Sequence, residues 1–506
     1  MNFLSLLSKY NSAVNSFIWG SFGIGLLLFS GLVTTILLKF FQLRHLCLWW
    51  GKTFGRLLKK EVLSNSNDKD SISPFQSLCT SLAATIGVGN IVGVTTAITL
   101  GGPGAVFWMW IAAILGMATN YSENVLGLYF RRKNFNGQWS GGAMYYLQDG
   151  LGKIKGLGFL GKILAKLFAL FTMLASFGIG SMGQVNKIVL NLASAFPVNS
   201  LACVILYDDV TLYSALIGIF LFILASLIIL GGIKRIAQIT EKIVPLMIVS
   251  FVLGSFTVIF KNRQNIIPAF GAIFSSAFNF RAGAGGVGGA VFASAFHQGF
   301  KRGVFSNESG LGSSVIIHAN SSATEPCEQG MWGMFEVFTD TIIVCTLTAL
   351  VVLTSGVYNI SSATSHFSDA TMVAAAFNSV FSFGNLGQKF VALSIFLFAF
   401  TTVLGWNHYG AKAWEYLFGI NRIGIYKLLH LLSIMCGAFL TSSLAWDISD
   451  SFNGLMMIPN LIGVLSMMGL VLKITKNYLD RKLKGKNIRP MLSFFSDIQK
   501  NNLKKR

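Results

Sequence analysis

Long apolar runs separated by short polar segments dominate this chain. Each run is close to the roughly 20 residues that an α-helix needs to cross a bilayer. Eleven such runs occur, at 17–41, 76–100, 104–130, 165–192, 211–231, 241–260, 283–301, 330–355, 388–410, 427–446 and 452–474. The pattern predicts an all-α polytopic membrane protein with 11 helices.

The second run is interrupted at its centre by Gly87-Val88-Gly89-Asn90. Glycine costs a helix interior about 1 kcal/mol relative to alanine, and an unpaired backbone group in hydrocarbon costs more. A break therefore needs an ion, a solute or water to replace the lost partners. Broken helices of this kind are typical of secondary transporters, whereas close helix packing is the alternative reason for glycines in a span.

A second glycine-rich stretch, Gly285-Gly286-Val287-Gly288-Gly289, lies in the run 283–301. If the first run is set aside, ten remain, and each set of five begins with a glycine break. An odd number of spans per set gives the two breaks opposite orientations, so their ends can meet near the midplane. The sequence thus predicts a 5+5 inverted repeat with one extra N-terminal helix. The expected organisation is an N-terminal helix and loop over 1–75, a transport core over 76–475 and a basic tail over 476–506.

Composition agrees with a membrane protein, because 53% of the 506 residues are hydrophobic and only 11% are charged. The net charge of +20 does not indicate nucleic acid binding, since the basic residues lie in the tail and in loops between apolar runs. Most of them fall in alternate loops, which by the positive-inside rule places the N-terminus outside and the C-terminus in the cytoplasm. The loop 261–281 is the exception. We expect a multi-pass protein of the cell membrane.

The chain shows no catalytic motif of the GxSxG, HExxH or Walker type, so we expect no enzyme activity. No loop is long enough to be a nucleotide-binding domain, which argues against an ATP-driven pump. A channel is disfavoured because a continuous pore needs no paired helix breaks. The six scattered cysteines form no CxxC pair and are interpreted as reduced core residues.

Polar side chains within the apolar runs are candidates for function. Glu123 can hold neighbouring broken backbone or pair with Arg131, and Gln184 can dock a substrate or form an interhelical bond. Asp340 is a buried counter-charge or an interfacial residue. Adjacent hydroxyls at Thr401 and Thr402 suit a hard cation, or they bond back to their own helix.

Three further features of the sequence are candidates for function, each with an ordinary structural role as the alternative. Trp406 can wall a small apolar side chain or lie at the membrane interface. The segment 302–313 is either a gate helix or an ordinary cytoplasmic loop capped by Ser306. His318 is expected to face solvent or cap a helix.

Several motifs closely resemble those of the alanine or glycine:cation symporter family, also called sodium:alanine symporters. They occur in order as Gly87-Val-Gly-Asn90, Gly101-Gly-Pro-Gly-Ala-Val-Phe-Trp108, Tyr121-Ser-Glu123, Gly141-Gly-Ala-Met-Tyr-Tyr146, Arg302-Gly-Val-Phe-Ser-Asn-Glu308, Gly310-Leu-Gly-Ser313 and Asp340-Thr-Ile-Ile-Val-Cys-Thr346. The resemblance covers roughly 70–475. The chain departs from the family pattern at Ala143, Ser309 and His408-Tyr-Gly-Ala411.

The resemblance implies a leucine-transporter-like inverted-repeat fold and the import of alanine, glycine or similar amino acids. It implies coupling to Na⁺, or in some members to H⁺. The alternative hypothesis is a proton-coupled carrier of the same fold that uses Glu123, Glu308 or Asp340 as the proton relay. The implied sodium ligands are the carbonyls of Ala83 and Ile86 and the hydroxyls of Thr401 and Thr402. The implied substrate-binding residues are Thr85, Gly87, Val88, Gly89, Asn90, Gln184 and Trp406. No cofactor is expected apart from the co-transported Na⁺, and the expected partners are the substrate, Na⁺ and the bilayer, with the protein a monomer.

Overall fold

The computed structural model describes residues 3–57, 71–198, 201, 204–207, 210–278, 287–359, 367, 369–439 and 444–504. Before the first predicted core helix lie α1 (Phe3–Ile18), α2 (Ser21–Leu37), α3 (Phe41–Arg44), α4 (Leu46–Lys52) and α5 (Phe54–Leu57). The first half then runs through α6 (Pro74–Thr85), η2 (Val88–Asn90), α7 (Val92–Gly101), α8 (Gly104–Tyr129), α9 (Ala143–Asp149), α10 (Gly158–Phe177), the π-helix η4 (Gly178–Met182), α11 (Gly183–Ala195), α13 (Leu212–Ile229) and α14 (Gly232–Lys261).

The second half runs through α15 (Ile266–Ala277), α16 (Val287–Asn307), α17 (Ser314–His318), α18 (Pro326–Val337), the π-helix η6 (Phe338–Cys345), α19 (Thr346–Thr354), α20 (Asp369–Asn378), α21 (Leu386–Phe418), α22 (Ile423–Phe439) and α23 (Leu444–Ser466). Helices α24 (Met468–Lys482) and α25 (Ser496–Lys504) follow. Two small antiparallel hairpins, β1 (Arg132–Lys133) with β2 (Trp139–Ser140) and β3 (Ile205–Tyr207) with β4 (Val210–Thr211), connect helices.

In the described part of the chain, eight helices are long and apolar enough to cross a membrane, or nine if α23 and α24, bent by 59°, form one span. The broken element α6–η2–α7 and the glycine-rich α16 match two further predicted runs but are not among those nine. The protein is therefore a multi-pass membrane protein, while the count of eleven stays a prediction.

The surface of the bundle carries the apolar character of a lipid-facing shell. On α14, Leu246, Val249, Leu253, Phe256 and Phe260 recur at helical spacing and are all more than half exposed. In water such a stripe would drive association, whereas hydrocarbon solvates it. Glu123, Gln184 and Asp340 of the spans are instead buried inside the bundle, which is where a transport site is built.

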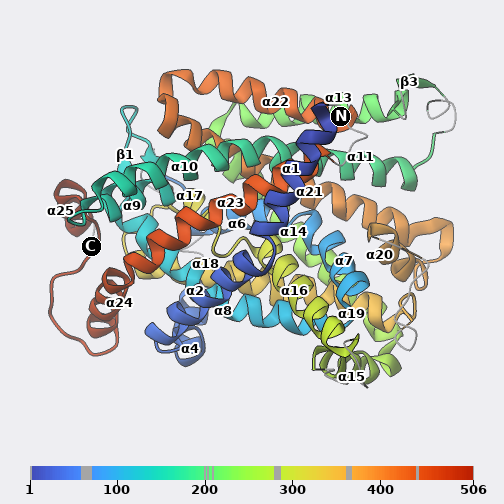
Figure 1. Cartoon of the computed structure of the whole chain (residues 1–506), viewed down its shortest axis with the longest axis horizontal. Helices are drawn as coiled ribbons and strands as arrows, with labels where there is room; N and C mark the ends of the chain where they lie inside the picture. The colour runs from blue at the N-terminus through green and yellow to red at the C-terminus, as the bar shows by residue number, and fades with distance from the viewer. Residues whose placement is uncertain are drawn as a thin grey trace.

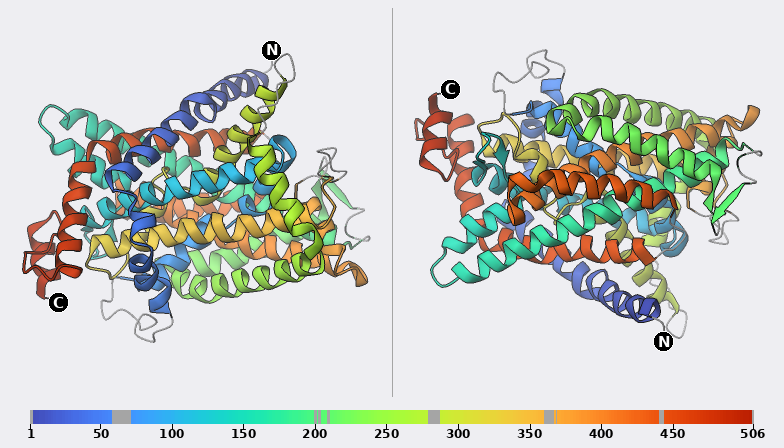
Figure 2. Two further views of the ribbon diagram at one scale, coloured as in Figure 1. Left: turned by 90° about the horizontal axis from the view of Figure 1, so that it is seen from below. Right: turned by 90° about the horizontal axis from the view of Figure 1, so that it is seen from above.

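Figures 1 and 2 show the long helices running side by side along the long axis of the molecule, with α9, α25 and the β1–β2 hairpin at one end and β3 and α20 at the other. Helix α8 packs against α16 and α18, and α21 packs against α6, α10 and α11. The two broken elements, α6–η2–α7 and α16–α17, thus lie between α8 and α21. This places the helix breaks inside the bundle.

The structure corrects the predicted position of the second break. Gly285 and Gly286 lie outside the described residues, but Val287, Gly288 and Gly289 form the start of α16 and are helical. The helix is instead interrupted at 308–313, between α16 and α17, where every residue is buried. The segment 302–313 is therefore not an ordinary cytoplasmic loop: its first part belongs to α16 and its last part is the second break.

Candidate ion and substrate site

We call residues 86–91, between α6 and α7, the first break. The last regular bond of α6 joins the Ile86 amide to the Leu82 carbonyl at 2.8 Å. The Gly87 amide, which a continuous helix would direct to Ala83, donates to Asn90 Oδ1 at 3.0 Å. The Asn90 amide, which would reach Ile86, donates to Gly87 O at 3.3 Å. The carbonyls of Ala83 and Ile86 are thus released from the helix ladder.

Thr402 meets this released backbone from α21. Its Oγ1 lies 3.4 Å from the Ile86 carbonyl and 3.0 Å from the Phe398 carbonyl. Thr401 Oγ1 also lies 3.0 Å from Phe398 O, but it is 3.7 Å from the Met247 sulfur of α14 rather than at the break. The structure therefore brings Thr402 to the first break directly and Thr401 only through the shared Phe398 carbonyl. The Phe398 oxygen was missed from sequence, although it lies three and four residues before the two threonines.

Gly87 makes the approach of α21 possible. A Cβ built on Gly87 would lie 2.6 Å from Thr402 Oγ1 and 3.4 Å from Gln184 Oε1. Gln184, which follows the π-helix η4, places Oε1 3.4 Å from the Val88 amide and donates to the Ile179 carbonyl at 3.1 Å. Side chains of α21 and α11 thus both reach the first break at Gly87. Both glycines of the break, Val88 and Asn90 are buried.

Trp406 and Thr85 are placed differently. The Trp406 side chain packs over Gly180 of η4, where an added Cβ would lie 2.5 Å from Trp406 Cβ. Its Nε1 donates to Glu308 Oε1 at 3.0 Å, so it touches the second break and is buried rather than interfacial. The Thr85 hydroxyl bonds back to the Ser81 carbonyl at 3.2 Å. Of the predicted substrate residues, Gln184 contacts the first break, while Trp406, one turn after Thr402 on α21, contacts the second break through Glu308.

The second break is held by side chains from distant elements. Glu308 adopts a left-handed φ of 55°, as Gly310 and Gly312 do at 87° and 76°. The Glu308 carboxylate accepts bonds from Ser313 at 2.5 Å and from Trp406. A non-glycine residue in this conformation is costly unless its surroundings fix it. These two donors supply that restraint.

Glu123 of α8 also serves the second break. Asn460 of α23 donates to Glu123 Oε1 at 2.5 Å and to the Gly310 carbonyl at 2.8 Å, and it accepts the hydroxyl of Tyr146. The Glu123 carboxylate lies beside the backbone amides of Gly310 and Gly312. The expectation that this carboxylate holds broken backbone is therefore met, at the second break. Arg131 instead binds the carbonyls of Ala319, Ser321 and Ala323.

Asp340 of η6 joins the first break to the end of α16. Its carboxylate accepts bonds from Asn90 of the first break at 2.8 Å, from Ser306 of α16 at 2.8 Å and from Thr341 at 2.9 Å. Asp340 is fully buried, so it is not interfacial. The π-helical geometry of η6 is a feature often found at functional sites.

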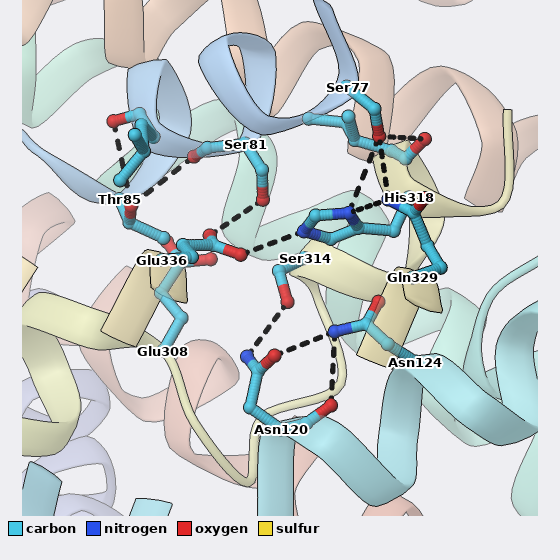
Figure 3. Close-up of polar contacts among 12 residues, drawn as sticks. Ser77, Ser81, Thr85, Asn120, Asn124, Glu308, Ser314, His318, Gln329 and Glu336 are labelled. Atoms are coloured by element: carbon cyan, nitrogen blue, oxygen red, sulfur yellow. Dashed lines mark hydrogen bonds and ion pairs between the residues drawn. The ribbon is translucent and has the colours of Figure 1, made fainter. Parts of the chain in front are cut away.

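A further buried network, drawn in Figure 3, was not expected from sequence. His318 Nε2 lies 2.9 Å from Glu336 Oε2, and Ser81 of α6 donates to Glu336 Oε1 at 2.6 Å. Gln329 and Ser77 approach His318 Nδ1 at 2.5 and 3.4 Å. The expectation that His318 faces solvent is wrong, because only 1% of the residue is exposed. The spacing of Ser77 and Ser81, one turn apart on an apolar helix, was the available signal.

Asn90 of the first break and Ser306 of α16 thus meet at the π-helix η6, and comparison with known proteins shows to which family this arrangement belongs. The family model described as the sodium:alanine symporter family matches residues 4–491. The chain belongs to the sodium:alanine symporter family. This symporter is 42% identical to the sodium/alanine symporter AgcS of Methanococcus maripaludis over 488 residues, covering 96% of this chain and 100% of the relative. It is 36% identical to the probable sodium/glutamine symporter GlnT of Bacillus subtilis, covering 98% and 95% of the two chains.

Two solved structures show that the symporter has the leucine-transporter fold. One is MhsT in complex with L-phenylalanine, with a TM-score of 0.52 at 12% identity, covering 81% of this chain and 92% of that one. The other is a Na⁺-coupled sialic acid symporter in a substrate-bound outward-open state, with a TM-score of 0.51 at 13% identity, covering 97% and 96%. Family and fold make this protein a secondary active symporter of the membrane and not an enzyme.

Proposed function

We propose that this symporter imports a small neutral amino acid, alanine or glycine, together with Na⁺ by alternating access. The observation that carries the proposal is the group of oxygens at the first break. The Thr402 hydroxyl lies 3.4 Å from the released Ile86 carbonyl, and both threonine hydroxyls share the Phe398 carbonyl. Hydroxyl and carbonyl oxygens are the ligands that hard cations prefer.

The Na⁺ ligands in this proposal are the carbonyls of Ala83 and Ile86 and the hydroxyls of Thr401 and Thr402. The Phe398 carbonyl completes the group. None of these ligands carries a formal charge, so a bound Na⁺ leaves a net positive charge in a buried site. A substrate carboxylate nearby neutralises that charge, and each ligand then strengthens the binding of the other.

The substrate is placed at the first break, against Thr85, Gly87, Val88, Gly89 and Asn90. The Val88 amide is held by Gln184 only at 3.4 Å, a long bond that a carboxylate can replace. Trp406, packed over Gly180, bounds the space on the side of the second break. Bulk at that position leaves room for a small side chain only.

The proposed topology places the N-terminus outside and the C-terminus in the cytoplasm, with the symporter working as a monomer. The basic β1–β2 hairpin and the C-terminal helices α24 and α25 lie at the same end of the molecule, as Figure 1 shows. Both basic segments then face the same side of the membrane, which fits the positive-inside rule. Residues 76–475 form the transport core, preceded by the segment 1–75 and followed by the tail 476–506.

Uptake of labelled alanine into proteoliposomes tests the function directly. Na⁺ and H⁺ gradients are imposed separately, with glycine, glutamine and leucine as competitors. We expect saturable uptake that requires the Na⁺ gradient and is competed by glycine. Better uptake of leucine than of alanine would contradict the small pocket.

Proton coupling through the same fold is the second candidate, favoured by the buried carboxylates Glu123, Glu308 and Asp340. In the part of the chain that the structure describes, these carboxylates accept side-chain hydrogen bonds from neutral amide, hydroxyl and indole donors. A carboxylate without a basic partner is costly to bury in its charged form. Uptake driven by a proton gradient in the absence of Na⁺ would favour this candidate over the first.

A further inference from the structure

A groove of about 710 Å³ lies between the end of α2 and α24, away from the candidate site. Its wall is apolar and includes Leu37, Leu472 and Leu479. Leu472 and Leu479 are seven residues apart and share one face of α24. We call this cavity the α2–α24 groove.

Both sides of the groove are fixed by the fold. After α2 ends at Leu37, Lys39 and Phe40 adopt left-handed φ values of 55° and 56°, which turns the chain sharply into α3. Gln42 of α3 is buried and donates to the Ile114 carbonyl at 3.3 Å, so the corner is anchored on α8. Tyr121 of α8 and Thr475 of α24 are joined at 3.1 Å between their hydroxyl oxygens. The groove is therefore preformed.

The rim of the groove is basic. Lys39, Arg44, Lys476 and Lys484 line it together with a single acid, Asp480. Lys484 and Lys486 hold the Asp480 carboxylate at 2.9 and 3.2 Å. In the part of the chain that the structure describes, no ion pair involves Lys39, Arg44 or Lys476.

His45 adds no positive charge to the groove near neutral pH. Burial, and to a smaller extent the neighbouring Arg44 guanidinium, lower the pKa of this imidazole from its ordinary value. The unpaired charge therefore belongs to Lys39, Arg44 and Lys476. Three cations line one groove whose single acid, Asp480, is already paired with Lys484 and Lys486, so they repel one another and an anion bound beside them relieves the repulsion.

The position of the groove indicates which class of anion binds there. The candidate span Ser8–Leu37 ends at its edge, so the groove lies at the boundary between hydrocarbon and headgroups. A soluble anion would satisfy the rim and leave the leucine wall uncovered. A phospholipid satisfies both, because its phosphate and its acyl chain are covalently joined in this order across the same boundary.

We propose that the α2–α24 groove binds an anionic phospholipid. The phosphate lies among Lys39, Arg44 and Lys476, and one acyl chain lies along Leu472 and Leu479. The bound lipid joins the extra N-terminal helix to α24, which follows the last long helix of the predicted transport core. The proposal does not depend on which substrate or ion the symporter carries.

Native mass spectrometry of the full-length protein in a neutral detergent tests the proposal, with dioleoyl phosphatidylglycerol and dioleoyl phosphatidylcholine as probes. We expect one phosphatidylglycerol to bind about tenfold more tightly than phosphatidylcholine. The triple variant Lys39→Gln, Arg44→Gln, Lys476→Gln should lose that preference. The matched control Lys153→Gln, Lys155→Gln, Lys162→Gln removes three exposed cations outside the groove and should keep it. Retention of the preference by the groove variant would overturn the proposal.

Wild-type protein provides a test that needs no variant. Dihexanoyl phosphatidylglycerol and glycerol phosphate compete against the dioleoyl lipid at equal concentration. We expect competition to weaken as the chains shorten, with glycerol phosphate the weakest, because the leucine wall contributes through buried apolar area. Equal displacement by glycerol phosphate would show that the groove binds a soluble phosphate and not a lipid.

Discussion

The two helix breaks of this symporter use opposite chemistry. At the first break, released carbonyls meet a threonine hydroxyl, and the Asp340 carboxylate reaches the break through the Asn90 side chain rather than through Thr402. At the second break, the backbone is held by Glu308 and Glu123, and both carboxylates are fixed in turn by side-chain donors from α21 and α23. Neutral oxygens can release an ion without leaving a buried charge behind. Buried carboxylates need permanent donors and are suited to hold geometry.

From this difference we expect the first break to bind and release the ion and the substrate, and the second break to hold the backbone in position. Substitutions at the first break should therefore change ion dependence, whereas those around the second break should change rate and stability. Four measurements test that division, taken from the largest expected effect to the smallest.

Gly87→Ala should abolish Na⁺-coupled uptake. The new Cβ would lie 2.6 Å from Thr402 Oγ1, so the hydroxyl has to leave the Ile86 carbonyl. The φ of Gly87 is −136°, which alanine adopts, so the variant should fold. We expect a loss of about a hundredfold in uptake, which corresponds to roughly 2.7 kcal/mol. Gly93→Ala is the control, because its nearest neighbouring atom is 4.0 Å away; an equal loss there would contradict the argument.

Thr402→Val should raise the Na⁺ concentration for half-maximal uptake by about tenfold or more, the effect of one lost ligand worth about 1.5 kcal/mol. Valine keeps the shape of threonine and removes the oxygen. Substrate affinity should fall mainly at low Na⁺, because the two ligands are linked. Thr402→Ser, which restores the hydroxyl, should recover the Na⁺ dependence. An unchanged Na⁺ dependence in both Thr402→Val and Thr401→Val would place the ion elsewhere, with Asn90 the next residue to test.

His318→Ala should lower the maximal uptake rate by about fivefold and leave the Na⁺ dependence unchanged. It removes the ring that holds Glu336 beside Ser81 of α6 and leaves a buried carboxylate short of a partner, which costs about 1–3 kcal/mol of stability. Thermal unfolding of the detergent-solubilised protein measures that loss. Glu336→Gln in the His318→Ala background should restore part of the stability, because the unpaired charge is gone. A shift in Na⁺ affinity would show that this network belongs to the ion site.

Thr401→Val should have the smallest effect, about a twofold to threefold rise in the Na⁺ concentration for half-maximal uptake. The corresponding free energy is smaller than that of one neutral hydrogen bond. Its hydroxyl is already bonded to the carbonyls of Leu397 and Phe398 at 2.9 and 3.0 Å and contacts Met247 rather than the break. Sodium titration of uptake, run side by side with Thr402→Val, measures the difference. Equal effects of the two substitutions would mean that both hydroxyls face the ion equally.

Sequence alone determined the membrane class, the family and the first break, because each depends on local pattern: apolar runs, a glycine pair and ordered motifs. It also pointed to Thr402 and Gln184, since a polar group in an apolar span needs a partner. The sequence predicted that Glu123 holds broken backbone, but it did not predict that this backbone is the second break.

Only the tertiary structure decided where the second helix breaks. Gly288 and Gly289 lie in the first turn of α16, whereas the polar segment 308–313 is unwound where Asn460 and Trp406, far along the chain, bond to it. The same holds for the burial of His318, which depends on Glu336, Gln329 and Ser77 arriving from two other helices. A sequence shows which backbone groups or side chains need partners, but the partners of a buried polar group are supplied by the packing of distant elements.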